Sequence, residues 1–384
     1  MNYDWDQIKN RLTSLKDLSS VGFADTIGNV ITAIFWFYIA ALSTPEKYGE
    51  IFYFISIAGT ASAISLVGTT NTLSVHIAKN IRIQSTLYFI SILIGIVSSV
   101  LFVIFLKRID VILVLFGFIF FNLASGSLLG KKFYQIYAKY VLLQKILTVV
   151  LGIVFYFTIG IESILYALAL SYFVFIKIIY YEFTNVKINF SLLKTHSTFI
   201  MNNYILSLSG IGQLDKLVIG PFLGYIILGQ YSLATQFIVV FMSFSFIIFK
   251  YILPHDASGN PNAKLKKITI LVSVIICGCG VLLLPFVISV LFPKYIEVIF
   301  PMQIMSLFVI PSTLTLLYSS KFLGLEKNKV LLAERIIEIS TLIIGILILG
   351  SLFGILGLAV TLLIASSAGA FFLILVNKRL PKLN

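Results

Sequence analysis

The sequence predicts an all-α protein that spans a membrane with twelve helices, arranged as two lobes of six. Two observations lead to this prediction. Hydrophobic residues make up 59% of the 384 residues, charged residues make up only 11%, and the mean hydropathy is +1.05. A soluble domain carries roughly 25% charged residues, so water cannot be the solvent for most of this surface. Apolar runs of the roughly 20-residue length that crosses a bilayer also recur along the whole chain.

The apolar runs are read here as helices, and together they account for most of the chain. Their expected ranges are 21–42, 51–77, 86–106, 111–130, 141–160, 163–183, 200–221, 228–253, 268–292, 301–323, 336–353 and 355–376. Closed β-barrels also span membranes, but they require short strands in which hydrophobic residues alternate with polar ones. Runs such as ISILIGIVSSVLFVIFL do not alternate.

The basic residues predict the orientation, because Lys and Arg accumulate in cytoplasmic loops. With the N-terminus inside, the cytoplasmic segments hold 19 of the 28 basic residues, and the outer loops hold only Lys47, Lys107, Arg108 and Lys294. The net charge of +13 is therefore almost entirely a property of the inner face. This distribution suits anionic lipids of the inner leaflet and argues against nucleic acid as a partner.

The domain prediction follows from the spans and from the residues that precede them. Trp5, Ile8, Leu12 and Leu15 recur at helical spacing, which is typical of an amphipathic helix on the membrane surface, although a frayed polar tail is the alternative. The expected divisions are an interfacial segment 1–20, an N-lobe 21–183, a cytoplasmic linker 184–199, a C-lobe 200–376 and a cytoplasmic tail 377–384. All connections are short, which leaves no room for a soluble catalytic domain.

A weak internal repeat supports two equivalent halves. LSTPEKYGEIFYF follows the first span and LGYIILGQYSLAT follows the seventh, and LLGKKFYQIYAKYVLLQKI resembles FLGLEKNKVLLAERIIEI. These matches align three glycine pairs, which are Gly49 with Gly229, Gly130 with Gly324 and Gly160 with Gly354. Parallel repeats related by an axis along the membrane normal are typical of transporters, whose sites lie near the repeat interface.

Polar residues at a spacing of three, four or seven lie on one face of a helix, and the first, second, seventh and eighth spans show such faces. The candidate cavity residues on these spans are Asp25, Asn29, Thr32, Thr69, Thr72, Asn202, Ser209, Gln213, Asp215, Lys216, Gln236 and Lys250. A polar face turned toward lipid is costly, so we expect these faces to line a substrate cavity. The alternative is that Ser and Thr serve helix packing.

Asp215 and Lys216 are adjacent charges in an apolar stretch, LSLSGIGQLDKLVIGPFLG. On a straight helix that begins near Phe199, Asp215 would lie about 24 Å into a hydrocarbon core of about 30 Å. Adjacent helical residues point in different directions, so we expect Lys216 in a wet cavity and Asp215 hydrogen-bonded to a neighbouring helix. The remaining membrane lysines are interpreted as reaching the cytoplasmic face by snorkelling; they are Lys145, Lys177, Lys250 and Lys321.

Three segments, LDKLVIGPFLGYIILGQYSLATQF, LFPKYIEVIFPMQIMSLF and FLGLEKNKVLLAERIIEIS, resemble the O-antigen and capsule flippases. These are the Wzx-type transporters of the multidrug/oligosaccharidyl-lipid/polysaccharide superfamily. The resemblance implies a MATE-like architecture with a central cavity lined by helices one, two, seven and eight. It places Asp215 and Lys216 at the charged position of helix seven. The family's cavity often uses Arg, whereas all five arginines here lie outside the spans, so Lys216 would act as a point charge.

The resemblance also implies a non-enzymatic function. The substrate would be an undecaprenyl-pyrophosphate-linked oligosaccharide, flipped from the cytoplasmic to the periplasmic leaflet of the bacterial inner membrane. Membrane lipids and polysaccharide polymerase machinery are the other expected partners. No cofactor is expected, although a proton or sodium ion could be coupled to transport. The runner-up is a cation-coupled multidrug exporter of the same superfamily, with Asp25 and Asp215 as cation sites.

The orientation can be tested with a reporter that is active only in the cytoplasm. A fusion after Lys194 should be active and a fusion after Pro293 should be silent, because the first position is predicted to lie inside and the second outside. The opposite pattern would reverse the orientation and both termini with it.

Overall fold

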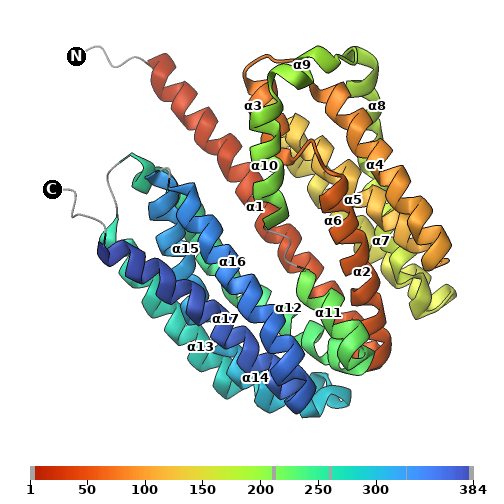
Figure 1. Ribbon diagram of the computed structural model, residues 1–384, viewed down its shortest axis with the longest axis vertical. Coiled ribbons are helices and arrows are strands. Elements are labelled where there is room, and N and C mark those ends of the chain that lie inside the picture. The colour runs from red at the N-terminus through yellow and green to blue at the C-terminus, as the bar shows by residue number, and fades with distance from the viewer. Residues whose placement is uncertain (1–4, 210–212, 259–261, 326, 380–384) are drawn as a thin grey trace. The chain divides into compact units, whose positions relative to one another are not determined.

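The structure is a computed structural model, and it describes residues 5–209, 213–258, 262–325 and 327–379 (Figure 1). Every regular element in these ranges is helical. The helices of the first part are α1 (Trp5–Leu42), α2 (Pro45–Ser65), α3 (Thr70–Ala78), α4 (Gln84–Phe105), α5 (Ile109–Gly130), α6 (Tyr134–Thr158), α7 (Ile164–Tyr172), α8 (Ile176–Asn185), α9 (Phe190–Thr195) and α10 (Ser197–Ser209). Those of the second part are α11 (Leu214–Leu223), α12 (Tyr225–Ala257), α13 (Ala263–Leu291), α14 (Ile299–Ser306), α15 (Val309–Gly324), α16 (Asn328–Gly345) and α17 (Ser351–Arg379).

Ten segments of the described chain are long and apolar enough to cross a membrane, so the protein is a multi-pass membrane protein. The difference from the twelve expected spans has two sources. The expected spans 336–353 and 355–376 lie within one 52-residue segment, Asn328–Arg379, which is interrupted by a π-helical turn and by Gly354 at a φ of +56°. The expected span 200–221 is not among the ten found in the described residues, where α10 ends at Ser209 and α11 begins at Leu214.

The expectation of one straight seventh helix is therefore wrong. Gln213, which precedes α11, has a non-helical φ of −129°, and residues 210–212 lie outside the described ranges. The depth of about 24 Å and the single polar face through Asn202, Ser209, Gln213 and Lys216 both assumed an unbroken helix. Neither follows from the structure.

The second span is also divided. Helix α2 ends at Ser65, and α3 begins at Thr70 after a short non-helical connection. The Thr69 hydroxyl accepts a hydrogen bond from the backbone N–H of Thr72 at 3.2 Å, which caps the new helix. Helix α1, in contrast, is continuous from Trp5, and the side chains of residues 5–20 lie outside the description. The interfacial role of that segment stays a prediction.

The chain forms two compact units. Residues 1–35 and 54–211 form the first unit, and residues 36–53 and 212–384 form the second. In the first unit α5 packs against α3 and α7, and in the second α12 packs against α15, and α16 against α17. The hairpin between α1 and α2 belongs to the second unit, where aromatic rings hold it. The rings of Trp36 and Phe52 are 4.8 Å apart, and those of Tyr48 and Tyr295 are 6.3 Å apart.

The aligned glycines Gly49 and Gly229 meet each other in the second unit. A Cβ atom on Gly49 would collide with the carbonyl oxygen of Tyr225, and a Cβ atom on Gly229 would collide with that of Pro45. Pro45 and Tyr225 are themselves equivalent, since each begins its helix. The contact is therefore reciprocal, as expected where two repeated segments cross on a local two-fold axis. Only glycine allows the two backbones to approach this closely.

A second pair of repeated segments has the same backbone shape. Gly130 ends α5 and Gly324 ends α15, and each helix is followed by a short turn. Before the next helix, Phe133 has φ and ψ of −85° and 57°, and Lys327 has −87° and 54°. The N–H groups of both residues donate to the carbonyl five residues earlier at 2.9 Å. The weak sequence repeat thus corresponds to a repeated helix–turn–helix geometry in the two units.

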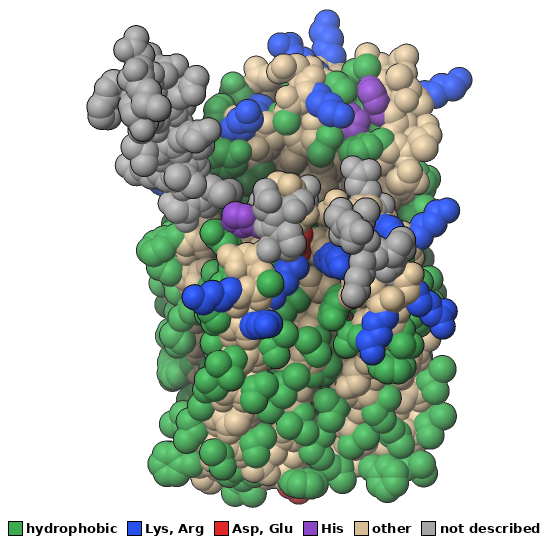
Figure 2. All heavy atoms as spheres, turned by 90° about the vertical axis from the view of Figure 1, so that its left-hand side faces the viewer, with side chains coloured by type: hydrophobic (Ala, Val, Ile, Leu, Met, Phe, Trp, Pro, Cys, Tyr) green, Lys and Arg blue, Asp and Glu red, His purple; other side chains and the backbone are tan. Residues whose placement is uncertain are grey.

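Large hydrophobic side chains cover much of the molecular surface. Phe105, Leu282 and Phe286 are each at least 70% exposed. On the face drawn in Figure 2, hydrophobic side chains cover one end, and Lys and Arg side chains gather toward the other. This distribution fits a surface solvated by lipid, with its cations where lipid meets water.

Gly49→Ala and Gly229→Ala should each lower the melting temperature of the purified protein in detergent. The added methyl group would press on backbone atoms that cannot rotate away, and overpacking of this kind costs about 1–3 kcal/mol. Gly278→Ala is the matched control, because no atom lies within 4 Å of its added Cβ and it is also helical. It should be stabilising by up to about 1 kcal/mol. Equal melting temperatures for all three variants would contradict the close crossing.

Candidate functional site

Asp215 is held by donors from two helices. It lies in the first turn of α11, where the helix dipole favours a negative charge. The hydroxyl group of Tyr231, a residue of α12 that is only 1% exposed, donates to Oδ2 at 2.6 Å. The backbone N–H of Lys216 donates to Oδ1 at 2.8 Å. The expected hydrogen bond from a neighbouring helix is confirmed, and it comes from a tyrosine that the sequence analysis did not single out.

Lys216 follows directly, and its side chain takes a different direction. Its Nζ lies 5.2 Å from the ring centroid of Phe52, a residue of α2 within the same unit. A cation over an aromatic face is stabilised without using its N–H donors. No hydrogen-bond acceptor for this Nζ is found among the described residues. The ammonium group thus keeps its donors, whereas the neighbouring carboxylate has its own partners.

Asp25, on α1 of the first unit, has a similar set of partners. The hydroxyl group of Tyr137 on α6 donates to its Oδ1 at 3.0 Å. Lys145, two helical turns further along α6, interacts electrostatically with the same carboxylate. The lysine stem packs on α1 at Gly28, where an added Cβ would come within 3.2 Å of the Lys145 Cγ. Lys145 is half-buried beside this acid, and the snorkelling interpretation of its side chain stays a prediction.

Each unit thus contains a carboxylate, a tyrosine hydroxyl that donates to it, and a lysine nearby. Tyr137 is 7% exposed and Tyr231 is 1% exposed, so both donors are in the interior. The sequence gives no sign that Tyr137 and Tyr231 have this role, because a tyrosine in an apolar run cannot be told from an aromatic residue that only packs. Only its position opposite an acid on another helix shows that its hydroxyl group is used.

The described contacts of the predicted threonines favour packing, the alternative that the sequence left open. Thr69 and Thr72 are buried, and their hydroxyl oxygens lie 2.9 Å apart. Thr32 donates to the carbonyl oxygen of Gly28 in its own helix at 2.7 Å. Such bonds satisfy a hydroxyl group locally and leave little of it for a substrate.

The other predicted residues are distributed over both units. Asn29 and Asn202 are exposed in the first unit, and Lys250 is exposed and Gln236 half-buried in the second. The buried Oε1 of Gln213 has no partner within the described part of the chain. The Ser209 side chain lies outside the described residues. Among those that are described, no three His, Cys, Asp or Glu side chains gather as metal ligands would.

Comparison with solved structures gives the fold. An inward-facing multidrug resistance MATE family transporter of the MOP superfamily aligns with a TM-score of 0.73 at 14% identity, over 91% of this chain and 94% of that one. The fold is MATE-like. An outward-facing MATE structure aligns with a TM-score of 0.64 at 16% identity, over 94% of each chain. The lipid II flippase MurJ, in an inward closed conformation, aligns with 0.73 at 15% identity, over 94% of this chain and 88% of that one.

No protein-family model matches the sequence, and no curated protein matches it significantly. The MATE-like fold therefore rests on structural similarity, and the resemblance to Wzx-type flippases rests on the sequence segments quoted above.

Tyr231→Phe should destabilise the protein by about 1.5–3 kcal/mol, because it removes a hydrogen bond to a charged group and leaves the half-buried Asp215 carboxylate with one donor fewer. Thermal unfolding in detergent measures the effect. Tyr166→Phe, at a position that is 39% exposed, is the control and should change stability by less than about 0.5 kcal/mol. If both variants unfold at the wild-type temperature, the Asp215–Tyr231 bond does not contribute to stability.

Proposed function

We propose that this protein is a flippase that carries an undecaprenyl-pyrophosphate-linked oligosaccharide from the cytoplasmic to the periplasmic leaflet by alternating access. The observation that carries the proposal is the difference between the two adjacent charges in α11. Asp215 is bonded by Tyr231 and by a backbone N–H, whereas the Lys216 ammonium group lies over a ring and keeps its donors. A site with an available cation and a satisfied carboxylate suits an anionic group.

A single lysine is sufficient to lower the main energy barrier of this transport step. A pyrophosphate headgroup must cross a region of low dielectric constant, and its loss of hydration is the main barrier. Outward movement of an anion is favoured by a membrane potential that is negative inside, by about 2.3 kcal/mol per charge per 100 mV. One point charge lowers the barrier, whereas a bidentate arginine would hold the phosphate more firmly and slow its release.

The structural neighbours support this class of function. MurJ is described as a lipid II flippase, so a lipid-linked substrate is compatible with the fold. The proposal includes the inner membrane as the location, both termini in the cytoplasm, and polysaccharide polymerase machinery as the partner that receives the product. Coupling to a proton or a sodium ion is compatible with the same proposal.

A cation-coupled multidrug exporter is the second candidate. It is favoured by the MATE transporter that aligns with the same TM-score as MurJ. In this function the carboxylates of Asp25 and Asp215 would be the sites that matter, and Lys216 would oppose a cationic substrate.

Substitution of Lys216 separates the two functions. In proteoliposomes that contain the undecaprenyl-pyrophosphate-linked oligosaccharide, Lys216→Arg should keep substantial flipping, Lys216→Ala should lose most of it, and Lys216→Glu should be inactive because it repels the headgroup. Lys177→Ala is the matched control at an exposed lysine and should flip normally. Each variant is compared at equal protein content in the membrane. Normal flipping by Lys216→Glu would eliminate the cationic mechanism.

The same assay shows what Asp215 does. Partial flipping by Asp215→Asn would fit a carboxylate that serves as a hydrogen-bond acceptor for Tyr231. Complete loss with normal protein content would indicate a proton or cation site. Two results together would favour the exporter. The wild type would fail to flip the lipid-linked oligosaccharide, and Asp215→Asn would export a cationic drug more slowly than the wild type does.

A further inference from the structure

A cavity of about 680 Å³ lies in the first unit, away from α11. It is formed where the turn from α3 to α4 meets the turn from α5 to α6. The polar and aromatic residues that line it are Asn80, Arg82, Gln84, Lys131, Lys132 and Phe133. Arg82 and Lys132 are exposed, so the cavity reaches the surface. The topology predicted from the basic residues places both turns at the cytoplasmic side.

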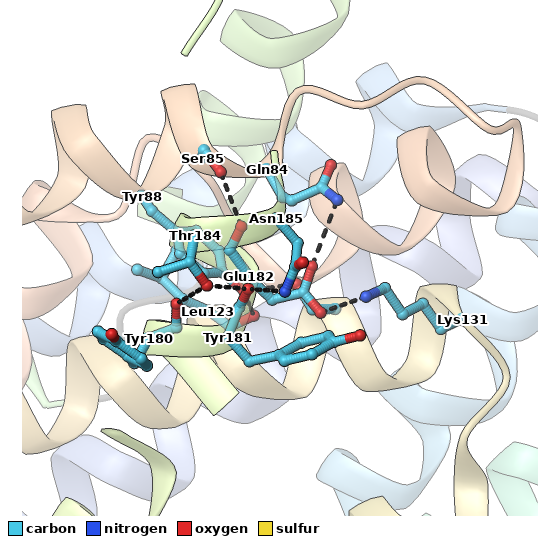
Figure 3. A network of polar contacts seen from close by, with 11 residues as sticks. Gln84, Ser85, Tyr88, Leu123, Lys131, Tyr180, Tyr181, Glu182, Thr184 and Asn185 are labelled. Atoms are coloured by element: carbon cyan, nitrogen blue, oxygen red, sulfur yellow. Dashed lines mark hydrogen bonds and ion pairs between the residues drawn. The ribbon is translucent and has the colours of Figure 1, made fainter. Parts of the chain in front are cut away.

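The cavity carries more positive than negative charge. Of its three cations, Lys131 forms an ion pair with Glu182 of α8, whose side chain is only 4% exposed (Figure 3). The side chains of Arg82 and Lys132 have no ion-pair or hydrogen-bond partner in the described part of the protein. The buried acid thus neutralises one cation, and two remain for an anion. An arginine and a lysine that line one cavity suit a phosphate group.

Glu182 is positioned by further contacts. Its Oε2 accepts a hydrogen bond from Gln84 Nε2 at 3.3 Å, and its backbone carbonyl accepts one from the Ser85 hydroxyl at 3.0 Å. The buried network therefore fixes the first turn of α4 to α8 and orients Lys131 at the wall of the cavity (Figure 3). The cavity wall at Gln84 and Lys131 is therefore held in place by the buried Glu182.

Gln84 supplies an observation that is independent of the charges. It is 4% exposed, it lines the cavity, and its Oε1 has no hydrogen-bond partner among the residues described. A buried acceptor without a donor costs free energy, which a ligand hydroxyl group would recover. The cavity therefore fits a group that carries both an anionic phosphate and a hydroxyl group.

The surroundings indicate a lipid rather than a soluble molecule. Phe133 is 49% exposed at the cavity, and Tyr180 and Tyr181 are 68% and 60% exposed on α8. Lys131 Nζ also lies 5.5 Å from the Tyr181 ring centroid. Exposed aromatic residues at the ends of spans are typical of the membrane–water interface, where anionic headgroups of the cytoplasmic leaflet lie.

We propose that this cavity binds the headgroup of an anionic glycerophospholipid of the phosphatidylglycerol type, with its phosphate between Arg82 and Lys132 and a headgroup hydroxyl donating to Gln84 Oε1. The site is separate from Lys216 and does not depend on which substrate is transported. It would hold one lipid of the cytoplasmic leaflet against the first unit.

The test measures lipid binding to the purified full-length protein in detergent by native mass spectrometry. The probes are dioleoyl phosphatidylglycerol, dioleoyl phosphatidylcholine, dioleoyl phosphatidylethanol and free glycerol 3-phosphate. Phosphatidylethanol has the same phosphodiester charge and lacks the hydroxyl group. The wild type should bind phosphatidylglycerol most tightly and phosphatidylethanol about five-fold more weakly, as the loss of one hydrogen bond implies.

The variant Arg82→Gln with Lys132→Gln should bind phosphatidylglycerol roughly 30-fold more weakly, because two cations near the membrane surface are removed. The variant Lys139→Gln with Lys187→Gln removes the same charge from exposed positions of the same unit, outside the cavity, and should change binding less than about three-fold. Lys132→Gln alone, at an exposed position, should weaken binding roughly five-fold without affecting folding. In Gln84→Met the difference between phosphatidylglycerol and phosphatidylethanol should disappear.

Several results would overturn the proposal. Equal losses in the cavity and control double variants would show a general charge effect. Equal binding of phosphatidylcholine and phosphatidylglycerol would show that the phosphate is not selected by charge. Binding of glycerol 3-phosphate as tightly as the lipid would assign the cavity to a soluble phosphate compound. Equal binding of phosphatidylglycerol and phosphatidylethanol by the wild type would remove the role given to Gln84.

Discussion

A carboxylate placed between helices in lipid needs a hydrogen-bond donor from the protein, because hydrocarbon offers none, and three carboxylates of the described chain are bonded in this way. Asp25 is bonded by Tyr137, Asp215 by Tyr231 and Glu182 by Gln84 and Lys131. For each of the three acids one donor lies on another helix, which is α6 for Asp25, α12 for Asp215 and α4 for Glu182, so the hydrogen bond also ties two helices together. An ionised group left without a partner in the hydrocarbon core would cost several kcal/mol, which is a large part of the stability of a folded protein. The arrangement of the helices around these acids is constrained accordingly.

The lysines near these acids differ in what their charge can do. Lys145 is half-buried beside Asp25, and Lys131 is paired with the buried Glu182, so both serve mainly to balance the charge of an acid. Lys216 lies beside an acid that has other donors, and its ammonium group rests on the ring of Phe52. The sequence shows each of the three only as a lysine within or beside an apolar run. Their partners distinguish a structural charge from one that is available to an anionic substrate.

Backbone irregularity provides the second constraint. Helices do not cross as closely as α2 and α12 unless both lack a Cβ atom at the contact, and Gly49 and Gly229 meet that condition. The turn at Gly354 uses a positive φ, as does the equivalent Gly160, so the repeat also preserves the glycines that redirect the chain. Both glycine pairs are therefore explained by the backbone: one pair allows a close crossing of helices, and the other allows a positive φ.

The sequence by itself determined the membrane-spanning, all-helical class, because the excess of apolar residues and the run lengths are local properties that need no tertiary information. It also located the glycine pairs of the repeat and the charges of α11. Only the tertiary structure decided that the seventh span is divided, that Thr69 caps a helix, and that Tyr137 and Tyr231 bond the acids. These features depend on which residues of neighbouring helices lie opposite a given side chain. Helical periodicity shows on which face of its helix a residue lies, but it does not show which residue of another helix that face contacts. The basic cavity in the first unit belongs to the same group, since its cations come from two turns that are distant in sequence and adjacent in space.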